Sequence, residues 1–455
     1  MRLDSAQPVL RVSIFLAAIS LSACGPFSSD SGSSSSSPSA ASTRPAPVTQ
    51  YDLANGCYRL QAQGSKGFVG QNGNAWVGNA PVATASVFYL KPTALAQYLL
   101  HDRNSQMLSG QAGQVGSVAR ASDAANWTLA TVNPGQYTLS LSSEAQFLAA
   151  ASDGALSLAA APTVFNFIPA TGCKAYPEIS DDIDGETYRG QGVDKPVLGF
   201  AEVHTHMAMG HEMSDGGKLV GPSAGGVMYG QMFHRFGVPH ALADCKDWHG
   251  ENGIRDPEAL VLDMKPLTTH ETQGWPTFVS WPAADSQLHQ AMYYKWVERA
   301  WKAGMRIMVS EGTNIAALCE VGRLAVLRPD ADCNDMSVGI KQVKYLFDLQ
   351  NYVDAQEGGP GKGWFRIVSS PEMAREVINE GKLAVVAGLE FANLFDCTVT
   401  FDPLGNETRG CTKESIDRQI DEVWNLGVRE LFPYHDVNSA LGGTGIFNGD
   451  TLNLV

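Results

Sequence analysis

The chain has 455 residues, of which 44% are hydrophobic, and its formal net charge is −15. This length is sufficient for two or three domains, and the apolar content is sufficient for a large buried core. The acidic balance and the lack of a basic stripe argue against a nucleic-acid partner.

Residues 1–23 have the pattern of a signal peptide. Arg2 and Arg11 precede an apolar run over 14–19, which is too short to span a bilayer in the mature protein. The following Leu21-Ser22-Ala23-Cys24 resembles the bacterial lipobox, which implies lipidation of Cys24; the alternative is an ordinary signal peptide with a chance cysteine. The residue after the cysteine is Gly25 and not Asp, which resembles the Gram-negative pattern for lipoproteins of the outer membrane. We therefore expect a cell-envelope lipoprotein that contacts the membrane through a lipid anchor.

Residues 24–50 are predicted to be a flexible tether, because 28–43 are almost all Ser, Gly, Pro, Ala and Thr. Seven cysteines follow Cys24, and an oxidising envelope favours their pairing. The disulfide candidates are Cys57 with Cys173, Cys319 with Cys333, and Cys397 with Cys411. Cys245 is then left over, and the connectivity stays open at this point.

Residues 51–175 contain three similar units of short, alternating apolar strands. The units open at Tyr58, Tyr98 and Tyr137, and they close on Val87-Phe88, Trp127 and Phe165. Three such units resemble a β-trefoil of the ricin-type or fascin-like kind, an all-β fold. Trefoils of this sort often bind sugars, so a glycan is one expected partner; the alternative is a spacer or docking domain.

Residues 176–196 are polar and Asp-rich and are predicted to be a linker. From 197 onward, apolar strands alternate with helices, which predicts a parallel α/β sheet. The expected strands cover 197–206, 305–310, 383–390 and 428–435, and the expected helices cover 288–303, 343–353, 370–380 and 415–426. The intervening 207–287 is Gly- and His-rich and could form a lid, with a helix within 225–242. Each histidine in it is interpreted as a surface or hydrogen-bonded residue.

Each expected strand ends on a ligand-type residue. The first carries His204 and His206, which lie on one face because side chains alternate along a strand. The next three end on Glu311, Glu390 and His435. Barrel enzymes place their chemistry at the carboxyl ends of the strands, so we expect a metal site there.

Two stretches resemble the membrane (renal-type) dipeptidase family of zinc β/α barrels. These are 379–390, with its Glu-Gly-Lys and Gly-x-Glu, and 426–438, with its Gly-Val-Arg strand followed by His435 and Asn438. The resemblance implies a TIM-type β/α barrel over 197–455 and two zinc ions in the complete barrel. It implies His204, His206 and Glu390 as metal ligands, with Glu390 bridging, and His435 as a catalytic residue that contacts substrate.

The chain departs from the family in two ways. The family has His-x-Asp on its first strand, whereas this chain has His204 and His206; imidazole also suits zinc. The family also takes further ligands from later strands, and this sequence stops at Val455, shortly after the fourth strand. We therefore expect a truncated barrel with half of the metal site; the alternatives are that another chain supplies the remainder or that the domain is degenerate.

These features predict a multidomain, zinc-dependent hydrolase of the envelope that cleaves a small amide or peptide bond, as a dipeptidase does. One alternative is a metal-dependent hydrolase of a non-peptide amide, ester or lactone. The other is a surface-anchored binding protein that uses the trefoil and has an inactive barrel.

Overall fold

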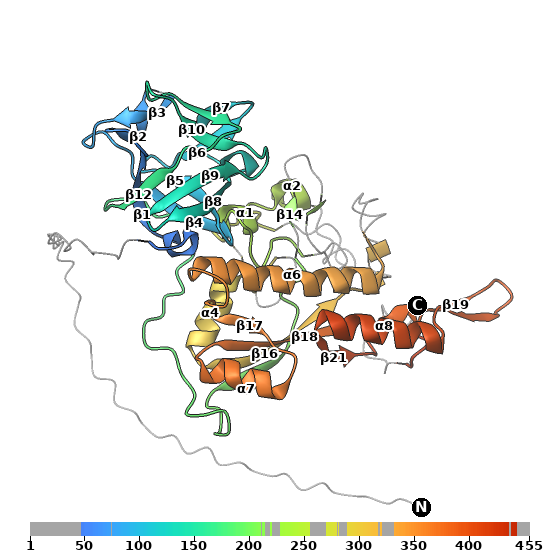
Figure 1. Cartoon of the computed structure of the whole chain (residues 1–455). Helices are drawn as coiled ribbons and strands as arrows, with labels where there is room; N and C mark the ends of the chain where they lie inside the picture. Colours follow the sequence, from blue (N-terminus) through green and yellow to red (C-terminus); the bar gives the residue numbers. More distant parts are fainter. Residues whose placement is uncertain are drawn as a thin grey trace, which may run out of the picture. The chain divides into compact units, whose positions relative to one another are not determined.

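The computed structural model describes most of the chain beyond the predicted tether (Figure 1). The described residues are 47–73, 75–210, 212–213, 219–220, 228–254, 270–279, 281, 289–316, 319–320, 332–435 and 438–443. The predicted signal peptide, Cys24 and residues 24–46 of the predicted tether lie outside these ranges. Among the described residues, no helix is both long enough and apolar enough to cross a membrane.

Twelve strands form a β-trefoil-like domain. They are β1 (Cys57–Ala62), β2 (Phe68–Asn72), β3 (Ala75–Ala80), β4 (Phe88–Ala94), β5 (Gln97–His101), β6 (Met107–Gln111), β7 (Gln114–Val118), β8 (Trp127–Asn133), β9 (Gln136–Leu141), β10 (Phe147–Ala150), β11 (Leu156–Ala159) and β12 (Phe165–Pro169). Six of them pair in a closed antiparallel ring, in the order β1-β4-β5-β8-β9-β12 and back to β1. The other six form the hairpins β2–β3, β6–β7 and β10–β11, one for each unit. This ring with three hairpins is the topology that the threefold repeat predicts.

The threefold similarity is visible in the register of the strands. A tyrosine faces another aromatic residue across each antiparallel pair: Tyr58 and Phe88, Tyr98 and Trp127, Tyr137 and Phe165. All six side chains are at most 1% exposed and share one core. The three tyrosine hydroxyls donate to backbone oxygens of the segment around the 3-10 helix η1 (Gln50–Leu53), which therefore closes one end of the ring.

The three predicted disulfides form: Cys57–Cys173, Cys319–Cys333 and Cys397–Cys411. Cys57 opens β1, and Cys173 follows β12, so the first bond joins the two ends of the trefoil. The second and third each close a loop between residues only 14 apart in the sequence.

Removal of the first disulfide is expected to destabilise the trefoil. The bond joins residues 116 apart, and a loop of that size lowers the entropy of the unfolded chain by an amount worth about 5 kcal/mol. In the Cys57→Ser/Cys173→Ser double variant, amide hydrogen exchange in β1 and β12 should therefore speed up strongly. The matched control is Cys397→Ser/Cys411→Ser, which should leave exchange in those two strands unchanged. Equal protection of β1 and β12 in all three proteins would contradict the expectation.

Five parallel strands follow the trefoil and form one sheet: β13 (Phe200–Thr205), β16 (Met305–Thr313), β17 (Phe365–Ile367), β18 (Leu383–Glu390) and β21 (Val428–Phe432). The four predicted strands are neighbours in chain order, β13-β16-β18-β21. The strand β17 was not expected. Both β17 and β21 pair with β18 on the side away from β16. The strand β17 pairs with the first half of β18, and β21 pairs with its second half.

The sheet is open over the part of the chain that the structure describes. Its edge strands expose apolar side chains, for example Phe200, which is 50% exposed, and Phe432, which is 42% exposed. The structure therefore shows a mixed α/β region with a parallel sheet, and a closed barrel is not shown.

Four helices pack on this sheet: α4 (Tyr294–Lys302), α6 (Asp335–Gln356), α7 (Pro371–Asn379) and α8 (Lys413–Leu426) (Figure 1). The helix α6 begins earlier than predicted, because the Asn334 side chain caps it by accepting from the Ser337 amide. The helix α4 begins later than the predicted 288, because His289 and Gln290 instead make a bridge to Tyr229. The predicted helices over 370–380 and 415–426 are confirmed within three residues.

The remaining elements are short. They are β14 (Glu212–Met213), β15 (Leu219–Val220), α1 (Val238–Ala241), α2 (Lys246–His249), β19 (Val399–Phe401), β20 (Glu407–Arg409) and the 3-10 helices η2 (Asp123–Ala125), η3 (Glu251–Gly253) and η4 (Leu394–Asp396). Of the helix expected within 225–242, the described residues contain only α1.

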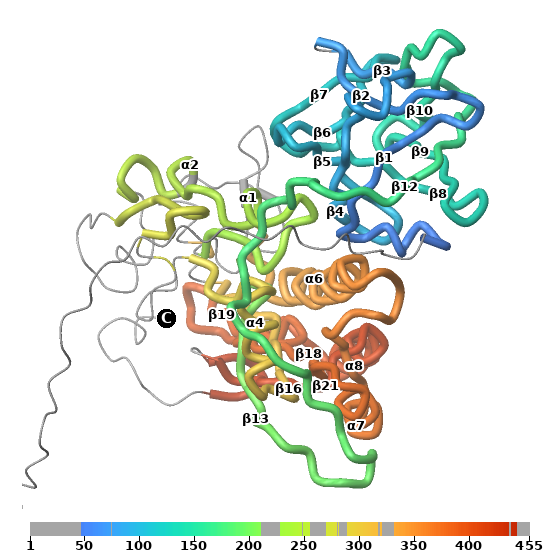
Figure 2. Tube along the Cα trace, turned by 90° about the vertical axis from the view of Figure 1, so that its left-hand side faces the viewer, coloured from blue at the N-terminus to red at the C-terminus, as the bar shows by residue number. Residues whose placement is uncertain are grey.

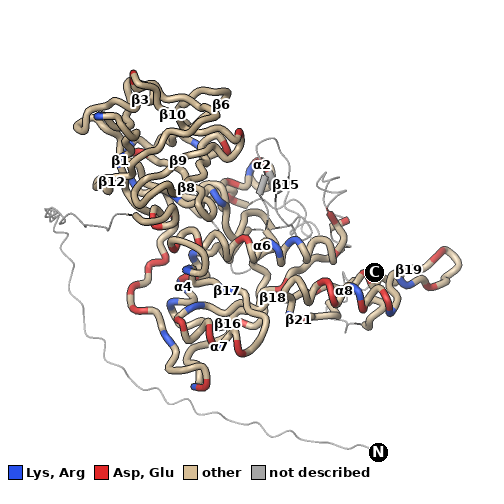
Figure 3. Tube along the Cα trace, in the orientation of Figure 1, with Lys and Arg blue, Asp and Glu red and all other residues tan. Residues whose placement is uncertain are grey.

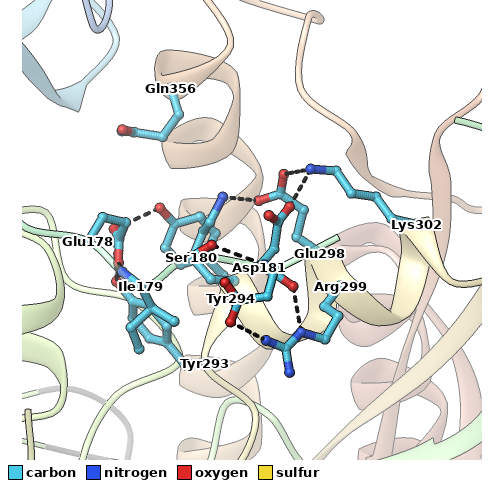
Figure 4. A network of polar contacts seen from close by, with 12 residues as sticks. Glu178, Ile179, Ser180, Asp181, Tyr293, Tyr294, Glu298, Arg299, Lys302 and Gln356 are labelled. Atoms are coloured by element: carbon cyan, nitrogen blue, oxygen red, sulfur yellow. Dashed lines mark hydrogen bonds and ion pairs between the residues drawn. The ribbon is translucent and has the colours of Figure 1, made fainter. Parts of the chain in front are cut away.

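The segment 176–199 has no helix or strand, and its Asp- and Glu-rich course is visible in Figure 3. Its first part lies against α4 through a network of polar contacts (Figure 4). Glu178 accepts from the hydroxyls of Tyr293 and Tyr294 at 2.8 and 2.9 Å. Lys302 forms ion pairs with Asp181 and with Glu298 of its own helix. Figure 2 shows the path of the chain from this network to β13.

Candidate metal centre

The carboxyl ends of four neighbouring strands bring the predicted ligands together. Thr205 of β13 pairs with Ser310 of β16, and Glu390 of β18 pairs with Thr313 of β16 and with Phe432 of β21. The strand ends therefore meet at one edge of the sheet. We call the group His204, His206, Glu390 and His435 the strand-end site.

Glu390 is the centre of this site. Its Oε2 lies 2.9 Å from Nε2 of His206 and 3.2 Å from Nε2 of His204, and its Oε1 lies 3.4 Å from Nε2 of His435. The Nε2 atoms of His204 and His206 are only 3.2 Å apart. The carboxylate is 2% exposed. One nitrogen from each imidazole therefore points to the same carboxylate.

Glu311 supports the end of β13. It is 2% exposed, its Oε2 accepts from the backbone amide of Thr205 at 3.0 Å, and its Oε1 lies 3.7 Å from Nδ1 of His204. Its backbone oxygen lies 3.2 Å from Nδ1 of His206. Contacts of this kind at the second ring nitrogen orient an imidazole toward a metal ion.

A third carboxylate, Glu430 of β21, lies in the same layer. The register places Gly388 of β18 between Glu311 and Glu430. A Cβ atom on Gly388 would lie 2.2 Å from Oε2 of Glu430 and 2.9 Å from Cγ of Glu311. The absence of a side chain at Gly388 therefore makes room for the two acidic side chains.

The charges of this cluster shift the pKa values of its members. Burial, together with the negative charges of Glu311 and Glu390, raises the pKa of Glu430 to about 7. Burial also raises the pKa of Glu311. Burial acts in the same direction on Glu390, but the hydrogen bond from His206 and the charge of His435 outweigh it, so the pKa of Glu390 is lowered. Burial lowers the pKa of His206, but its contacts with Glu390 and Glu311 outweigh it and raise that pKa.

The donor set fits a divalent metal ion such as zinc. Two buried carboxylates and the half-buried Glu430 in one layer are costly without a compensating cation. Imidazole nitrogen and carboxylate oxygen are both zinc ligands. The ligand atoms of His204, His206 and Glu390 lie within 4.8 Å of one another, close enough to reach one ion.

All four residues predicted for this site therefore lie together, whereas the role of Glu430 was missed. Its position was read only as part of an apolar strand. The available signal was alternation: Val428, Glu430 and Phe432 share one face of β21, so the half-buried Glu430 brings an acidic group onto a face that is otherwise apolar.

Substitution of Gly388 by Ala is expected to weaken metal binding at the strand-end site by about 10-fold, because its Cβ would displace the side chains of Glu311 and Glu430. Zinc titration of the purified variant would measure this. The matched control is Gly116→Ala in β7, where the added Cβ meets only Ser109 Oγ at 3.7 Å. Wild-type zinc affinity in Gly388→Ala would show that the acidic layer has no part in the site.

No protein-family model matches this chain, and no curated protein matches it either. Three solved structures illustrate what the comparison with known folds finds. The designed threefold-symmetric protein ThreeFoil has 16% identity and a TM-score of 0.23, and the match covers 25% of this chain and 99% of that chain. SeviL bound to the asialo-GM1 saccharide has 17% identity and a TM-score of 0.23, and the match covers 26% of this chain and 98% of that chain. The BEL β-trefoil has 14% identity and a TM-score of 0.22, and the match covers 26% of this chain and 94% of that chain. Because these scores are low, the assignment of the trefoil rests on the strand pairing described above.

Proposed function

We propose that this protein is a zinc-dependent hydrolase that cleaves a small amide or peptide bond, as a dipeptidase does. The observation that supports this most is the approach of three imidazole nitrogens to the buried Glu390 carboxylate at the ends of consecutive parallel strands. Metal hydrolases built on β/α barrels place their ligands at this edge. The resemblance of 379–390 and 426–438 to the renal-type dipeptidases points in the same direction.

The residues divide into metal-holding and substrate-facing groups. His204, His206 and Glu390 would hold the metal, and Glu390 could bridge two ions. Zinc bound in such a site lowers the pKa of water toward about 7 and polarises a carbonyl oxygen. His435 contacts Glu390 through Nε2 and would donate a hydrogen bond to the oxyanion that develops on the substrate; contacts of this type are worth about 3 kcal/mol.

We also propose that the parallel sheet is the first half of a TIM-type β/α barrel. The consecutive strand order and the exposed apolar side chains on both edge strands support this, because further strands would cover them. The proposed location is the bacterial envelope, with a lipid on Cys24. The three disulfides support an oxidising compartment.

The test is hydrolysis of a dipeptide panel by the purified chain with added zinc. We expect cleavage that a chelator abolishes, and that falls by at least about 100-fold in His204→Ala because the metal is lost. His234→Ala, which changes a histidine outside the site, should retain wild-type rates. Equal rates in His204→Ala and the wild type would refute the metal-dependent mechanism.

The same assay separates the alternatives. Cleavage of an ester, a lactone or a non-peptide amide, with no cleavage of dipeptides, would favour the related hydrolase activity. Binding to a glycan array without any hydrolysis would favour a surface-anchored binding protein that acts through the trefoil.

A further inference from the structure

A second cluster of ligand-type side chains lies in the segment that follows β13. Cys245 immediately precedes α2 and His249 ends it, so a single helical turn places both on one face. His270 and His289 come from two later segments. The Sγ atom of Cys245 lies 3.5 Å from Nε2 of His270 and 3.2 Å from Nε2 of His289. One ligand atom from each of the four residues lies within 4.8 Å of the other three.

The three imidazoles surround a common point. Their ring centroids are 4.9, 5.0 and 5.3 Å apart, and the ring planes are inclined by 67 to 77°. Rings in this arrangement meet edge to face, so they do not form a stack. Cys245, His249 and His289 are each at most 7% exposed. The cluster is therefore a group of one thiol and three imidazoles that is buried except for the half-buried His270.

Backbone hydrogen bonds hold these segments in place. The amide of Cys245 donates to the oxygen of Thr272, and the amide of His270 donates to the oxygen of Asn252. Gly253 has φ +66°, and a Cβ atom there would lie 2.3 Å from Nδ1 of His270. The chain thus uses a glycine where the His270 ring passes close to the backbone.

We propose that Cys245, His249, His270 and His289, here called the Cys-His site, bind one structural zinc ion. One thiolate and three imidazoles form a tetrahedral ligand set that zinc favours, and the soft sulfur disfavours magnesium, calcium and manganese. Four protein ligands leave no open position for a substrate, which is the property of a structural site. This proposal does not depend on the hydrolase activity proposed above.

The Cys-His site is joined to the strand-end site through few residues. Gln290 follows His289, and its side-chain amide donates to the oxygen of Met207 at 2.9 Å. Met207 follows His206. Among the described residues between 207 and 289, helices and strands are at most four residues long, so a metal cross-link would supply much of the order there. Zinc in the Cys-His site would therefore help to position His206.

Cobalt substitution tests this proposal, because Co²⁺ bound to a thiolate gives a charge-transfer absorption that cobalt bound to imidazole and carboxylate lacks. The purified chain is stripped with a chelator and titrated with Co²⁺. We expect the absorption in the wild type and, at equal intensity, in His204→Ala/Glu390→Gln, which lacks strand-end ligands. In Cys245→Ser the absorption should be absent. This variant should also bind one equivalent of zinc less than the wild type. His270→Cys should increase it about two-fold, because two thiolates then bind.

The variants also separate failure of this proposal from failure of the hydrolase proposal. Absence of the absorption in the folded wild type, or its persistence in Cys245→Ser, would overturn the Cys-His site. If Cys245→Ser does not fold, the wild type and His270→Cys decide the question. Loss of the absorption in folded His204→Ala/Glu390→Gln would also overturn the proposal, because the thiolate–metal bond would then depend on ligands outside the Cys-His site.

Discussion

Glu390→Gln is expected to lower the zinc affinity of the strand-end site by at least about 100-fold. Loss of a partner that merely orients a ligand already costs about 10- to 100-fold, and Glu390 is the carboxylate that all three imidazoles approach. The amide of Gln has nearly the same size, so packing around the 2% exposed side chain is retained. The negative charge is lost. Hydrolysis at limiting zinc should fall in parallel.

Isothermal titration with zinc would measure the change, after the Cys-His site has been filled or removed by Cys245→Ser. The matched control is Glu407→Gln in β20, where the side chain is exposed and pairs with Arg409 of the same strand. It should bind zinc as the wild type does. An unchanged affinity in Glu390→Gln would mean that the imidazoles alone hold the ion, and Glu390 would no longer count as a ligand.

Much of the strand-end site could be predicted because local rules determine it. Alternation along a strand places His204 and His206 together, and parallel neighbours in chain order bring Glu390 and His435 to the same edge. The trefoil was predictable for a related reason, since a threefold repeat in sequence requires three equivalent units in space. The short strand β17 was missed, because three residues give too short a pattern to recognise.

The Cys-His site could not be predicted in the same way. Cys245 and His249 are one helical turn apart, but His270 and His289 come from segments with little periodicity. Each histidine alone was interpreted as a surface or hydrogen-bonded residue, and Cys245 was the cysteine left over from the disulfides. Only the tertiary structure brings the four together, through contacts such as Cys245 with Thr272 that no repeat or alternation signals. The odd cysteine beside several histidines was the one signal in the sequence.

His206 offers the sharpest test of the proposed resemblance to the renal-type dipeptidases, which implies Asp at this position of the first strand. His206→Ala should lower zinc affinity by about 100-fold, because one ligand 2.9 Å from Glu390 is lost. His206→Asp should recover most of that loss, because carboxylate is also a zinc ligand.

The Asp variant should also change the metal preference of the site. Carboxylate suits manganese better than imidazole does, so the ratio of zinc to manganese affinity should fall by about 10-fold relative to the wild type. Competition titrations of the two metals would measure the ratio, with His234→Ala as the control. If His206→Asp binds metal no better than His206→Ala, the position does not supply a ligand. The imidazole would then only orient Glu390 through its contacts with Glu311 and Glu390.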